Sequence, residues 1–329
     1  DSNTRHDSEC RIVEMMNQYP YDFALLCLKM MLLSDENPHI GAIGSTLLYN
    51  SAKRGIWLNS PDFINSFWSI YSQNIGKILL NKNSTIKSLG ISTLAEIVNY
   101  TYENSGSTVI QEFLVELSKK KEFEFVMLSV LKEILLDEKG LKGFDQVFLI
   151  NLISKDYDDK DSIIGKTQLF FLIAGQIDID NDFFVRVFTY LLSNITQDNI
   201  ASFLSSIDSF SEKHSLLFNS ILKELTIYLC NIALDKNCNY RIIPLFIFCT
   251  ISKDAPLMCS NNQCFYQNVF RCLINIISET DENDVFNDTD ELNNTSSVSI
   301  AKDTLFCISM FSGTPDYFFF MEEIKNEYF

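Results

Sequence analysis

Apolar residues recur every three or four positions along almost the whole chain, and this periodicity constrains the fold more than any other feature. Between residues 123 and 136, for example, Val126, Val130 and Ile134 share one helical face. The alternation with period two that marks a half-buried strand is nowhere sustained. The 11 Gly and 6 Pro are too few for the turns of a sandwich or barrel. The pattern therefore predicts an all-α chain of about sixteen helices joined by short polar breaks.

The predicted helices fall into pairs, and the second helix of a pair often carries small residues. Gly41 and Gly44 lie in one such helix, which starts near residue 38, and Gly90 lies in another, which starts near residue 84. A spacing of about 45 residues between paired helices is typical of HEAT and armadillo repeats. Residues 1–329 contain no Pro- or Ser-rich linker. We therefore expect a single domain, a solenoid of stacked helical hairpins, with an irregular helical domain as the alternative.

The net charge of −17, from 26 basic and 43 acidic residues, indicates which partners the chain can bind. A strongly acidic surface repels nucleic acid and anionic membranes, so we expect no direct nucleic-acid binding and predict basic proteins or peptides as partners. No apolar run approaches the roughly 20 residues of a membrane span, so we expect no membrane insertion. Residues 1–30 lack the apolar core of a signal peptide. The nine Cys lie mostly inside apolar segments, which favours reduced thiols in a cytosolic or nuclear protein.

The sequence contains no common catalytic or phosphate-binding motif. Its three His lie far apart in the sequence, at His6, His39 and His214. A Cys–His pair such as Cys230 with His214 stays open, because catalytic groups assemble in space. Cys259 and Cys264 have a loose spacing and no His nearby, which favours buried thiols over a metal site. We expect no catalytic residue, no metal and no cofactor.

An acid-rich segment, residues 280–292, lies in a stretch from 272 to 301 that contains no Lys or Arg. Its acidic residues are Asp281, Glu282, Asp284, Asp288, Asp290 and Glu291. Like charges at this density resist packing and stay solvated. The segment is therefore either a solvated connection between two helices or an electrostatic lure that speeds association with a basic partner.

Five features, taken in order, resemble a known family. Residues 5–16 read RHDSECRIVEMM, residues 40–51 read IGAIGSTLLYNS, and Trp57 follows. Residues 90–97 read GISTLAEI, and residues 281–284 read DEND. In this order they resemble the amino-terminal half of importin-β, a nuclear import receptor of the karyopherin-β family. Transportin, a related import receptor, is the main alternative within the superfamily.

The resemblance covers nearly the whole chain and implies its fold. It implies a right-handed superhelical α-solenoid of about eight HEAT-type helical hairpins. By this register the chain starts at the second helix of the first repeat and stops inside the ninth. We therefore expect an amino-terminal fragment or a short, divergent member of the family.

The resemblance also implies residues that bind partners. In importin-β the acidic loop contacts the GTPase Ran and lies beside bound cargo. Residues 281–284 match the start of that loop, whereas Asp288, Asp290 and Glu291 share only its charge, and the family's Trp is absent. Asn50 matches a family position on an early second helix on the Ran side, although Tyr49 stands where a Lys is expected.

A second implied surface binds the Phe-Gly repeats of nucleoporins in apolar slots between neighbouring outer helices. The slot would lie between helices 144–153 and 182–192. Its candidate residues are Phe148, Leu149 and Leu152 in the first helix and Phe184 and Val185 in the second, with Asn181 in place of a Glu. Apolar residues at such spacings are also typical of an ordinary core, and this alternative stays open.

The function that the resemblance implies is that of a non-enzymatic transport receptor. We expect it to bind Ran-GTP, Phe-Gly nucleoporins and either basic cargo or the adaptor importin-α. We expect a monomer that shuttles between cytoplasm and nucleus through the nuclear pore. A generic HEAT- or armadillo-type interaction scaffold is the alternative function, and an enzyme is the third.

Overall fold

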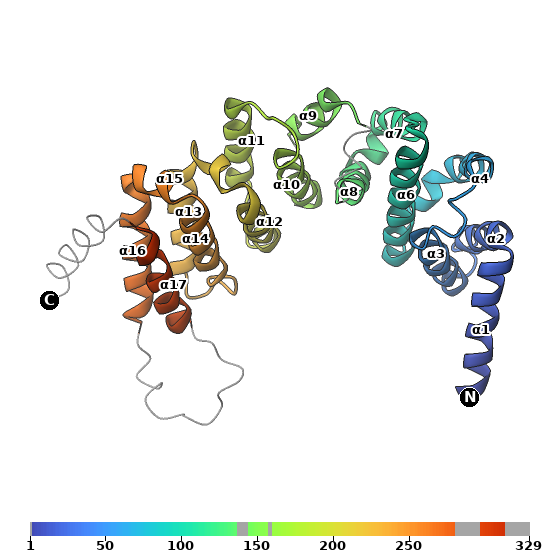
Figure 1. Ribbon diagram of the computed structural model, residues 1–329, viewed down its shortest axis with the longest axis horizontal. Helices are drawn as coiled ribbons and strands as arrows, with labels where there is room; N and C mark the ends of the chain where they lie inside the picture. The colour runs from blue at the N-terminus through green and yellow to red at the C-terminus, as the bar shows by residue number, and fades with distance from the viewer. Residues whose placement is uncertain (1, 137–143, 157–159, 280–296, 313–329) are drawn as a thin grey trace, which may run out of the picture. The chain divides into compact units, whose positions relative to one another are not determined.

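The computed structural model describes residues 2–136, 144–156, 160–279 and 297–312, and within these ranges all regular structure is helical (Figure 1). The all-α prediction is therefore confirmed, with seventeen α-helices in the described ranges. Contacts divide the chain into two compact units, Asp1–Gln176 and Ile177–Phe329. The single, unbroken solenoid over residues 1–329 stays a prediction. Among the described helices, none is both long and apolar enough to cross a membrane.

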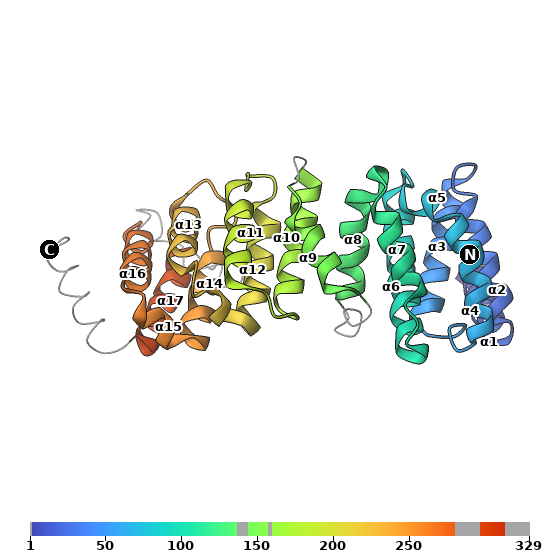
Figure 2. The same ribbon diagram turned by 90° about the horizontal axis from the view of Figure 1, so that it is seen from above.

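The first unit contains four helical hairpins, preceded by α1. The helices are α1 (Ser2–Gln18), α2 (Pro20–Leu32), α3 (Pro38–Lys53), α4 (Pro61–Gln73), α5 (Ile75–Leu79), α6 (Ser84–Ser105), α7 (Val109–Ser118), α8 (Glu124–Leu135), α9 (Gln146–Ser154) and α10 (Lys160–Ala174), with the 3₁₀ helix η1 (Lys121–Phe123) before α8. α2 packs on α3, α5 on α6, α7 on α8 and α9 on α10. The second helices α3, α6, α8 and α10 pack on one another in that order, as Figure 2 shows.

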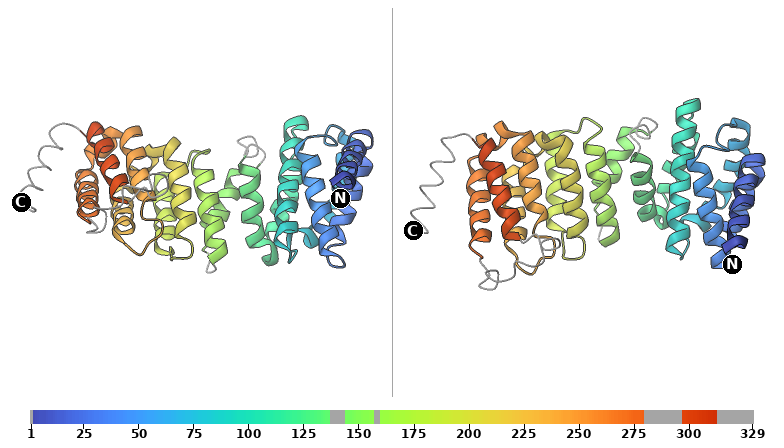
Figure 3. Two further views of the ribbon diagram at one scale, coloured as in Figure 1. Left: turned by 90° about the horizontal axis from the view of Figure 1, so that it is seen from below. Right: turned by 60° about the horizontal axis from the view of Figure 1, so that its bottom comes forward.

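The second unit contains three more hairpins. Its helices are α11 (Asn181–Ser193), α12 (Ile200–His214), α13 (Leu222–Leu234), α14 (Ile243–Asp254), α15 (Pro256–Asn261), α16 (Gln263–Ile277) and α17 (Ser297–Phe311), with the 3₁₀ helix η3 (Ser215–Phe218) after α12. Stacked aromatic rings join α11 to α12, since the ring centroids of Phe184 and Phe210 lie 6.3 Å apart. α13 packs on α14 and α16, while α12, α14 and α17 form a row of second helices (Figure 3).

The polar breaks in the sequence cap the helices that follow them. α3 and α6 begin at Pro38 and Ser84, where the sequence predicts second helices to start. Asn37 Oδ1 accepts a hydrogen bond from the Ile40 N–H at 3.2 Å, and Asn83 Oδ1 accepts one from the Thr85 N–H at 3.0 Å. Such caps satisfy N–H groups that have no partner within the helix. The short breaks therefore stop one helix and start the next.

The small residues of the second helices allow the two helices of a hairpin to pack closely on one another. A Cβ atom at Gly44 of α3 would lie 2.6 Å from the Cβ of Met30 and 2.7 Å from the carbonyl oxygen of Cys27, both on α2. At Gly41 it would lie 2.6 Å from the Cβ of Ser34. Any larger residue would push α2 and α3 apart, so these glycines set the spacing inside the hairpin.

Polar side chains in the first unit link helices at their C-terminal ends, where carbonyl groups lack helical partners. Gln176 donates from Nε2 to the Leu135 carbonyl of α8 at 3.2 Å. Lys166 of α10 is 1% exposed and donates from Nζ to the Lys155 carbonyl at the end of α9, at 2.6 Å. Burial lowers the pKa of Lys166 to about 8, against an opposing effect of Asp156. Hydrogen bonds from these side chains therefore join neighbouring helices in addition to the apolar packing between them.

Candidate protein-interaction site

The acid-rich segment lies within one hairpin. α16 ends at Ile277 and α17 begins at Ser297, close to the helix end near residue 278 and the helix start near residue 295 that the sequence predicts. The six acidic candidates, Asp281, Glu282, Asp284, Asp288, Asp290 and Glu291, lie outside the described residues. Glu279 is the last described residue before the segment.

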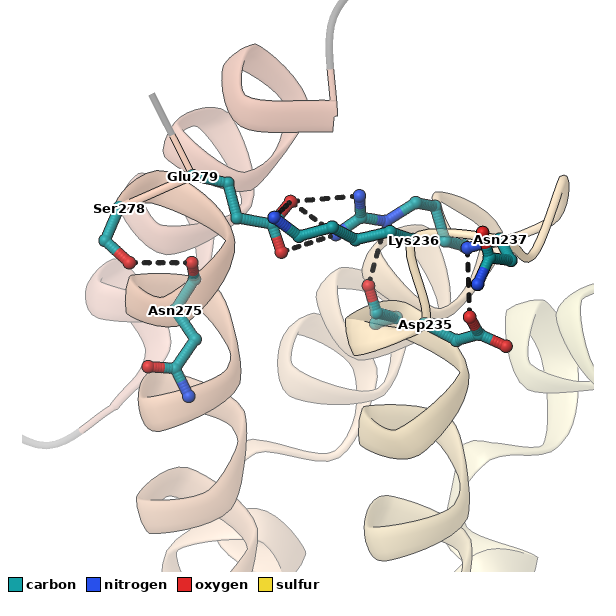
Figure 4. A network of polar contacts seen from close by, with 8 residues as sticks. Asp235, Lys236, Asn237, Asn275, Ser278 and Glu279 are labelled. Carbon is teal, nitrogen blue, oxygen red and sulfur yellow. Dashed lines mark hydrogen bonds and ion pairs between the residues drawn. The ribbon is translucent and has the colours of Figure 1, made fainter. Parts of the chain in front are cut away.

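Glu279 is held by two basic residues of the loop between α13 and α14 (Figure 4). Arg241 donates from Nη1 to Oε2 at 3.0 Å and from Nη2 to Oε1 at 3.1 Å. The Lys236 ammonium lies 3.9 Å from Oε2, and Figure 4 shows it extending toward Glu279. The Arg241 and Glu279 side chains are only 14% and 17% exposed, so water competes weakly for this bidentate pair.

Arg241 also joins the pair to a helix end. Its Nε donates to the Ala233 carbonyl near the C-terminus of α13 at 3.0 Å, where positive charge complements the helix dipole. The loop itself is shaped by Asp235, whose Oδ1 accepts the Asn237 N–H at 2.9 Å. One guanidinium therefore connects the end of α13 with the end of α16. We call these three side chains, Lys236, Arg241 and Glu279, the stem clamp.

The sequence did not single out Arg241 or Lys236. The only signal was indirect: the stretch from residue 272 to residue 301 has no basic residue of its own, so a partner for Glu279 has to come from elsewhere. Arg241 lies 38 positions away in sequence and reaches Glu279 only because α13 packs on α16.

The first set of slot candidates lies on α9, in the first unit, within the helix predicted at 144–153. Leu149 is fully buried and Leu152 is 3% exposed, so both belong to the core of the unit. Phe148 is partly exposed, and its ring stacks on Phe144 with centroids 6.4 Å apart. Of the three, Phe148 is therefore the residue that a partner can reach.

The second set lies on α11, in the second unit, within the helix predicted at 182–192. Phe184 is 3% exposed and stacks on Phe188 at 6.0 Å. Val185 is partly exposed. Val185 is thus the accessible member of this set, while Phe184 fills the core between α11 and α12.

Asn50 lies exposed near the C-terminal end of α3. Lys53 and Arg54 follow on the same helix end, and the Lys53 ammonium lies 5.8 Å from the centroid of the Tyr49 ring. Asn50 can therefore contact a partner without any change of fold.

In the structure His214 and Cys230, the Cys–His pair that the sequence leaves open, each contact other residues. The His214 ring packs on Phe210, with ring centroids 5.0 Å apart. The Cys230 thiol lies 3.6 Å from the Asn268 carbonyl oxygen, and a hydrogen bond with Cys272 and burial raise its pKa. A thiol with a raised pKa is a poor nucleophile at neutral pH. Among the described residues, no three His, Cys, Asp or Glu side chains gather in a way that could hold a metal ion.

Comparison of the sequence with protein-family models finds no match, and comparison with curated proteins finds none either. Solved structures of the karyopherin Kap121p do match. Kap121p bound to RanGTP matches with a TM-score of 0.76 and 15% identity over 98% of this chain and 33% of that chain. Kap121p bound to Nup53p matches with a TM-score of 0.77 and 15% identity, over 95% of this chain and 32% of that chain.

A third match is the karyopherin Kap121p bound to the SUMO protease Ulp1p, with a TM-score of 0.78 and 15% identity over 96% of this chain and 32% of that chain. The chain thus spans about a third of the length of the solved proteins that it resembles. At this identity the likeness establishes the fold. The resemblance to the karyopherin-β family is confirmed at that level, and the fold is an α-solenoid of helical hairpins.

Proposed function

We propose that the chain is part of a nuclear transport receptor of the karyopherin-β type, which binds Ran-GTP, nucleoporins and basic cargo and catalyses no reaction. The observation that carries this proposal is the karyopherin fold over nearly the whole chain, including its likeness to Kap121p bound to RanGTP. The net charge of −17 agrees with basic partners. The finer assignment is to an importin-β-like receptor that takes importin-α or basic cargo.

The acid-rich segment acts in this proposal as an electrostatic lure. Asp281, Glu282 and Asp284, with the acidic residues that follow, attract a basic patch on Ran or on cargo and raise the rate of association. The stem clamp supports this role because it holds Glu279, the last described residue before the segment, against Arg241 of the neighbouring hairpin. Residue 279 is thereby fixed, and the acidic residues follow it in the sequence.

Nucleoporin binding uses the accessible apolar residues of the first helices. Phe148 and Val185 are partly exposed, and each lies next to a buried residue of the same helix, Leu149 or Phe184. Burial of a Phe ring against such a residue contributes at most about 1.5–3 kcal/mol to the free energy of binding, which suits weak and multivalent binding.

Ran-GTP and cargo oppose one another in this proposal. Asn50 on α3 contributes to the Ran side, and the acid-rich segment meets both ligands. If the two ligands compete for the segment or favour different curvatures, each weakens the other by the same factor. Cargo is then released where Ran-GTP is abundant, and the receptor shuttles between cytoplasm and nucleus.

The decisive experiment is titration of the purified chain with Ran loaded with a non-hydrolysable GTP analogue and, separately, with GDP. We expect tight binding of the GTP form and at least tenfold weaker binding of the GDP form. A generic helical scaffold has no reason to distinguish the two nucleotide states. Equal affinity for both forms, or no binding by a chain that is folded by circular dichroism, would therefore overturn the proposal in favour of a scaffold.

A further inference from the structure

The exposed surface of α1 carries a histidine and a cysteine about one helical turn apart. Cys10 Sγ lies 3.8 Å from His6 Nε2, and both side chains are exposed. Residues four positions apart are neighbours on one face of a helix, so the two side chains meet without help from another helix. Figure 1 shows α1 at the N-terminal end of the first unit, where it packs on α2. Solvent therefore reaches both groups at the same place.

Cys10 differs from the other cysteines in its access to solvent. All nine cysteines lie among the described residues, and all nine are free thiols. Cys10 is exposed, whereas the other eight are buried or partly exposed. A thiolate sulfur and an imidazole nitrogen are the ligand atoms that Zn²⁺ prefers in proteins. The pair on α1 thus offers two suitable ligand atoms on an open surface.

The distance between the two ligand atoms fits a shared zinc ion. Zn²⁺ binds thiolate sulfur at about 2.3 Å and imidazole nitrogen at about 2.0–2.1 Å, with tetrahedral angles. Two such atoms on one ion lie about 3.6 Å apart by trigonometry. His6 Nε2 and Cys10 Sγ are separated by 3.8 Å. The ion can therefore bind both atoms after small side-chain rotations, with no change in the helix backbone.

One chain supplies only half of a zinc site. Among the described residues, no third His, Cys, Asp or Glu side chain completes a group that could hold a metal ion. Glu14 lies one turn beyond Cys10, but its Oε1 accepts a hydrogen bond from Gln18 Nε2 at 3.0 Å. Structural zinc sites almost always have four ligands, and two thiolates with two imidazoles are a common set. A two-fold dimer supplies the same pair of ligands twice.

We propose that α1 carries half of a zinc site, and that one Zn²⁺ joins two copies of this chain through His6 and Cys10 of each copy. Each Cys10 thiol releases its proton to solvent and binds as a thiolate, and each neutral His6 binds through Nε2. One bound ion therefore releases two protons. Zn²⁺ has no redox chemistry, so no electron is transferred. Mg²⁺ and Ca²⁺ require oxygen ligands and do not replace it.

The surroundings of the pair make the dimer depend on the metal. Val13 lies one turn beyond Cys10 on the same face and is 45% exposed, so it offers the second copy an apolar contact beside the ion. The net charge of −17 on each copy opposes association. A single apolar contact does not overcome this repulsion, whereas four ligand bonds to one ion do. Without zinc the chain remains a monomer.

The test is sedimentation equilibrium of the intact chain, with a phosphine reductant that prevents disulfide dimers. We expect the mass to double when Zn²⁺ is added, with one ion bound per two chains, and EDTA to restore the monomer. Co²⁺ in place of Zn²⁺ should give sulfur-to-metal charge-transfer absorption and the intense d–d bands of a tetrahedral site. An unchanged mass, one ion on each monomer, or a dimer that forms without metal would each overturn the proposal.

Variants assign the ligands. His6→Ala and Cys10→Ser should each remain monomeric in Zn²⁺, because each change leaves the dimer two ligands short. His39→Ala and Cys238→Ser alter an exposed histidine and a partly exposed cysteine, and they should dimerise like the unaltered chain. Circular dichroism checks that all four variants are folded. A zinc-dependent dimer that survives Cys10→Ser would contradict the assignment.

The metal titration uses the unaltered chain, so the proposal remains testable even if a variant folds poorly. The readouts are mass, stoichiometry and absorption, and none of them involves Ran. Failure of the zinc site and failure of the transport function are therefore separate outcomes.

Discussion

The Arg241 guanidinium donates three hydrogen bonds to the Glu279 carboxylate, at 3.0 to 3.1 Å, and a fourth to the Ala233 carbonyl at 3.0 Å. One side chain thereby joins the C-terminal ends of α13 and α16, which are the first helices of two neighbouring hairpins. Glu279 is also the last described residue before the acid-rich segment. The pair therefore links the stacking of two hairpins to the place where the candidate site begins.

Replacing Arg241 with Gln should lower the free energy of unfolding by about 1.5–3 kcal/mol, because Glu279 then loses a charged partner in a partly buried place. Lys236→Gln should change it by less than about 0.5 kcal/mol, since the Lys236 side chain is 67% exposed and its ammonium lies 3.9 Å from the carboxylate. Urea denaturation followed by circular dichroism measures both. Equal effects of the two variants would contradict the assignment of the clamp to Arg241.

Neutralising the six acidic residues of the acid-rich segment to Asn or Gln should slow association with a basic partner and flatten its dependence on salt. The matched control neutralises six exposed acidic residues of the first unit, Asp22, Asp35, Glu36, Asp62, Glu103 and Glu122, and reaches the same net charge. Stopped-flow rates between low and physiological salt compare the two. If association slows equally in both variants, the net charge of the protein and not the acid-rich segment sets the association rate.

Phe148→Ser should weaken binding of a Phe-Gly peptide while leaving the fold intact, because Phe148 is only partly buried. Leu149→Ala, one position further on, should instead destabilise the protein by about 2–5 kcal/mol, because Leu149 is 0% exposed. Peptide titration by NMR and thermal denaturation separate the two effects. A large drop in the melting temperature of Phe148→Ser would identify Phe148 as core.

Gly44→Ala should destabilise the protein by about 1–3 kcal/mol, because the new Cβ would lie 2.6 Å from the Met30 Cβ and 2.7 Å from the Cys27 carbonyl oxygen. Gly76→Ala is the control, since its Cβ would lie 3.7 Å from Phe123 Cζ, an ordinary contact. In a helix this change should be neutral or stabilising, by up to about 1 kcal/mol. Thermal denaturation of both variants checks the close approach of α2 and α3.

Stability should fall as the pH rises above about 9 in the presence of reductant. Burial raises the pKa of Cys27 from 9.0 to about 12, so between these values the unfolded chain loses a proton that the folded chain keeps. Cys259 shows the same shift. Each such thiol contributes a slope of up to about 1.4 kcal/mol per pH unit. Lys166 contributes the opposite slope between about 8 and 10.5, but it is a single group.

Cys27→Ala should reduce the slope with which the free energy of unfolding falls at alkaline pH. Any change in stability at neutral pH is a separate effect of the substitution. Leu28→Ala, which removes a neighbouring side chain that is 1% exposed, is the control for lost packing. It should lower stability at every pH and leave the slope unchanged. Melting temperatures from pH 7 to pH 10.5 test both, and equal slopes in Cys27→Ala and the unaltered chain would contradict the assignment.

The helices could be predicted because their signals are local. The apolar periodicity placed α9 and α11 close to their observed bounds, and the polar breaks before Pro38 and Ser84 marked two second helices at their observed starts. The candidate slot residues were harder to predict. Periodicity identifies the face of a helix that is apolar, but it does not distinguish Leu149, which is buried, from Phe148, which is partly exposed.

The sequence by itself determined the all-α class, the hairpin repeat and the place of the acid-rich segment, because these depend on residues within a few turns of one another. Only the tertiary structure decided the partner of Glu279. Arg241 lies 38 residues from Glu279, and nothing local links the two. Helix packing brings such distant groups together, because stacking buries apolar faces first and thereby sets which polar side chains meet.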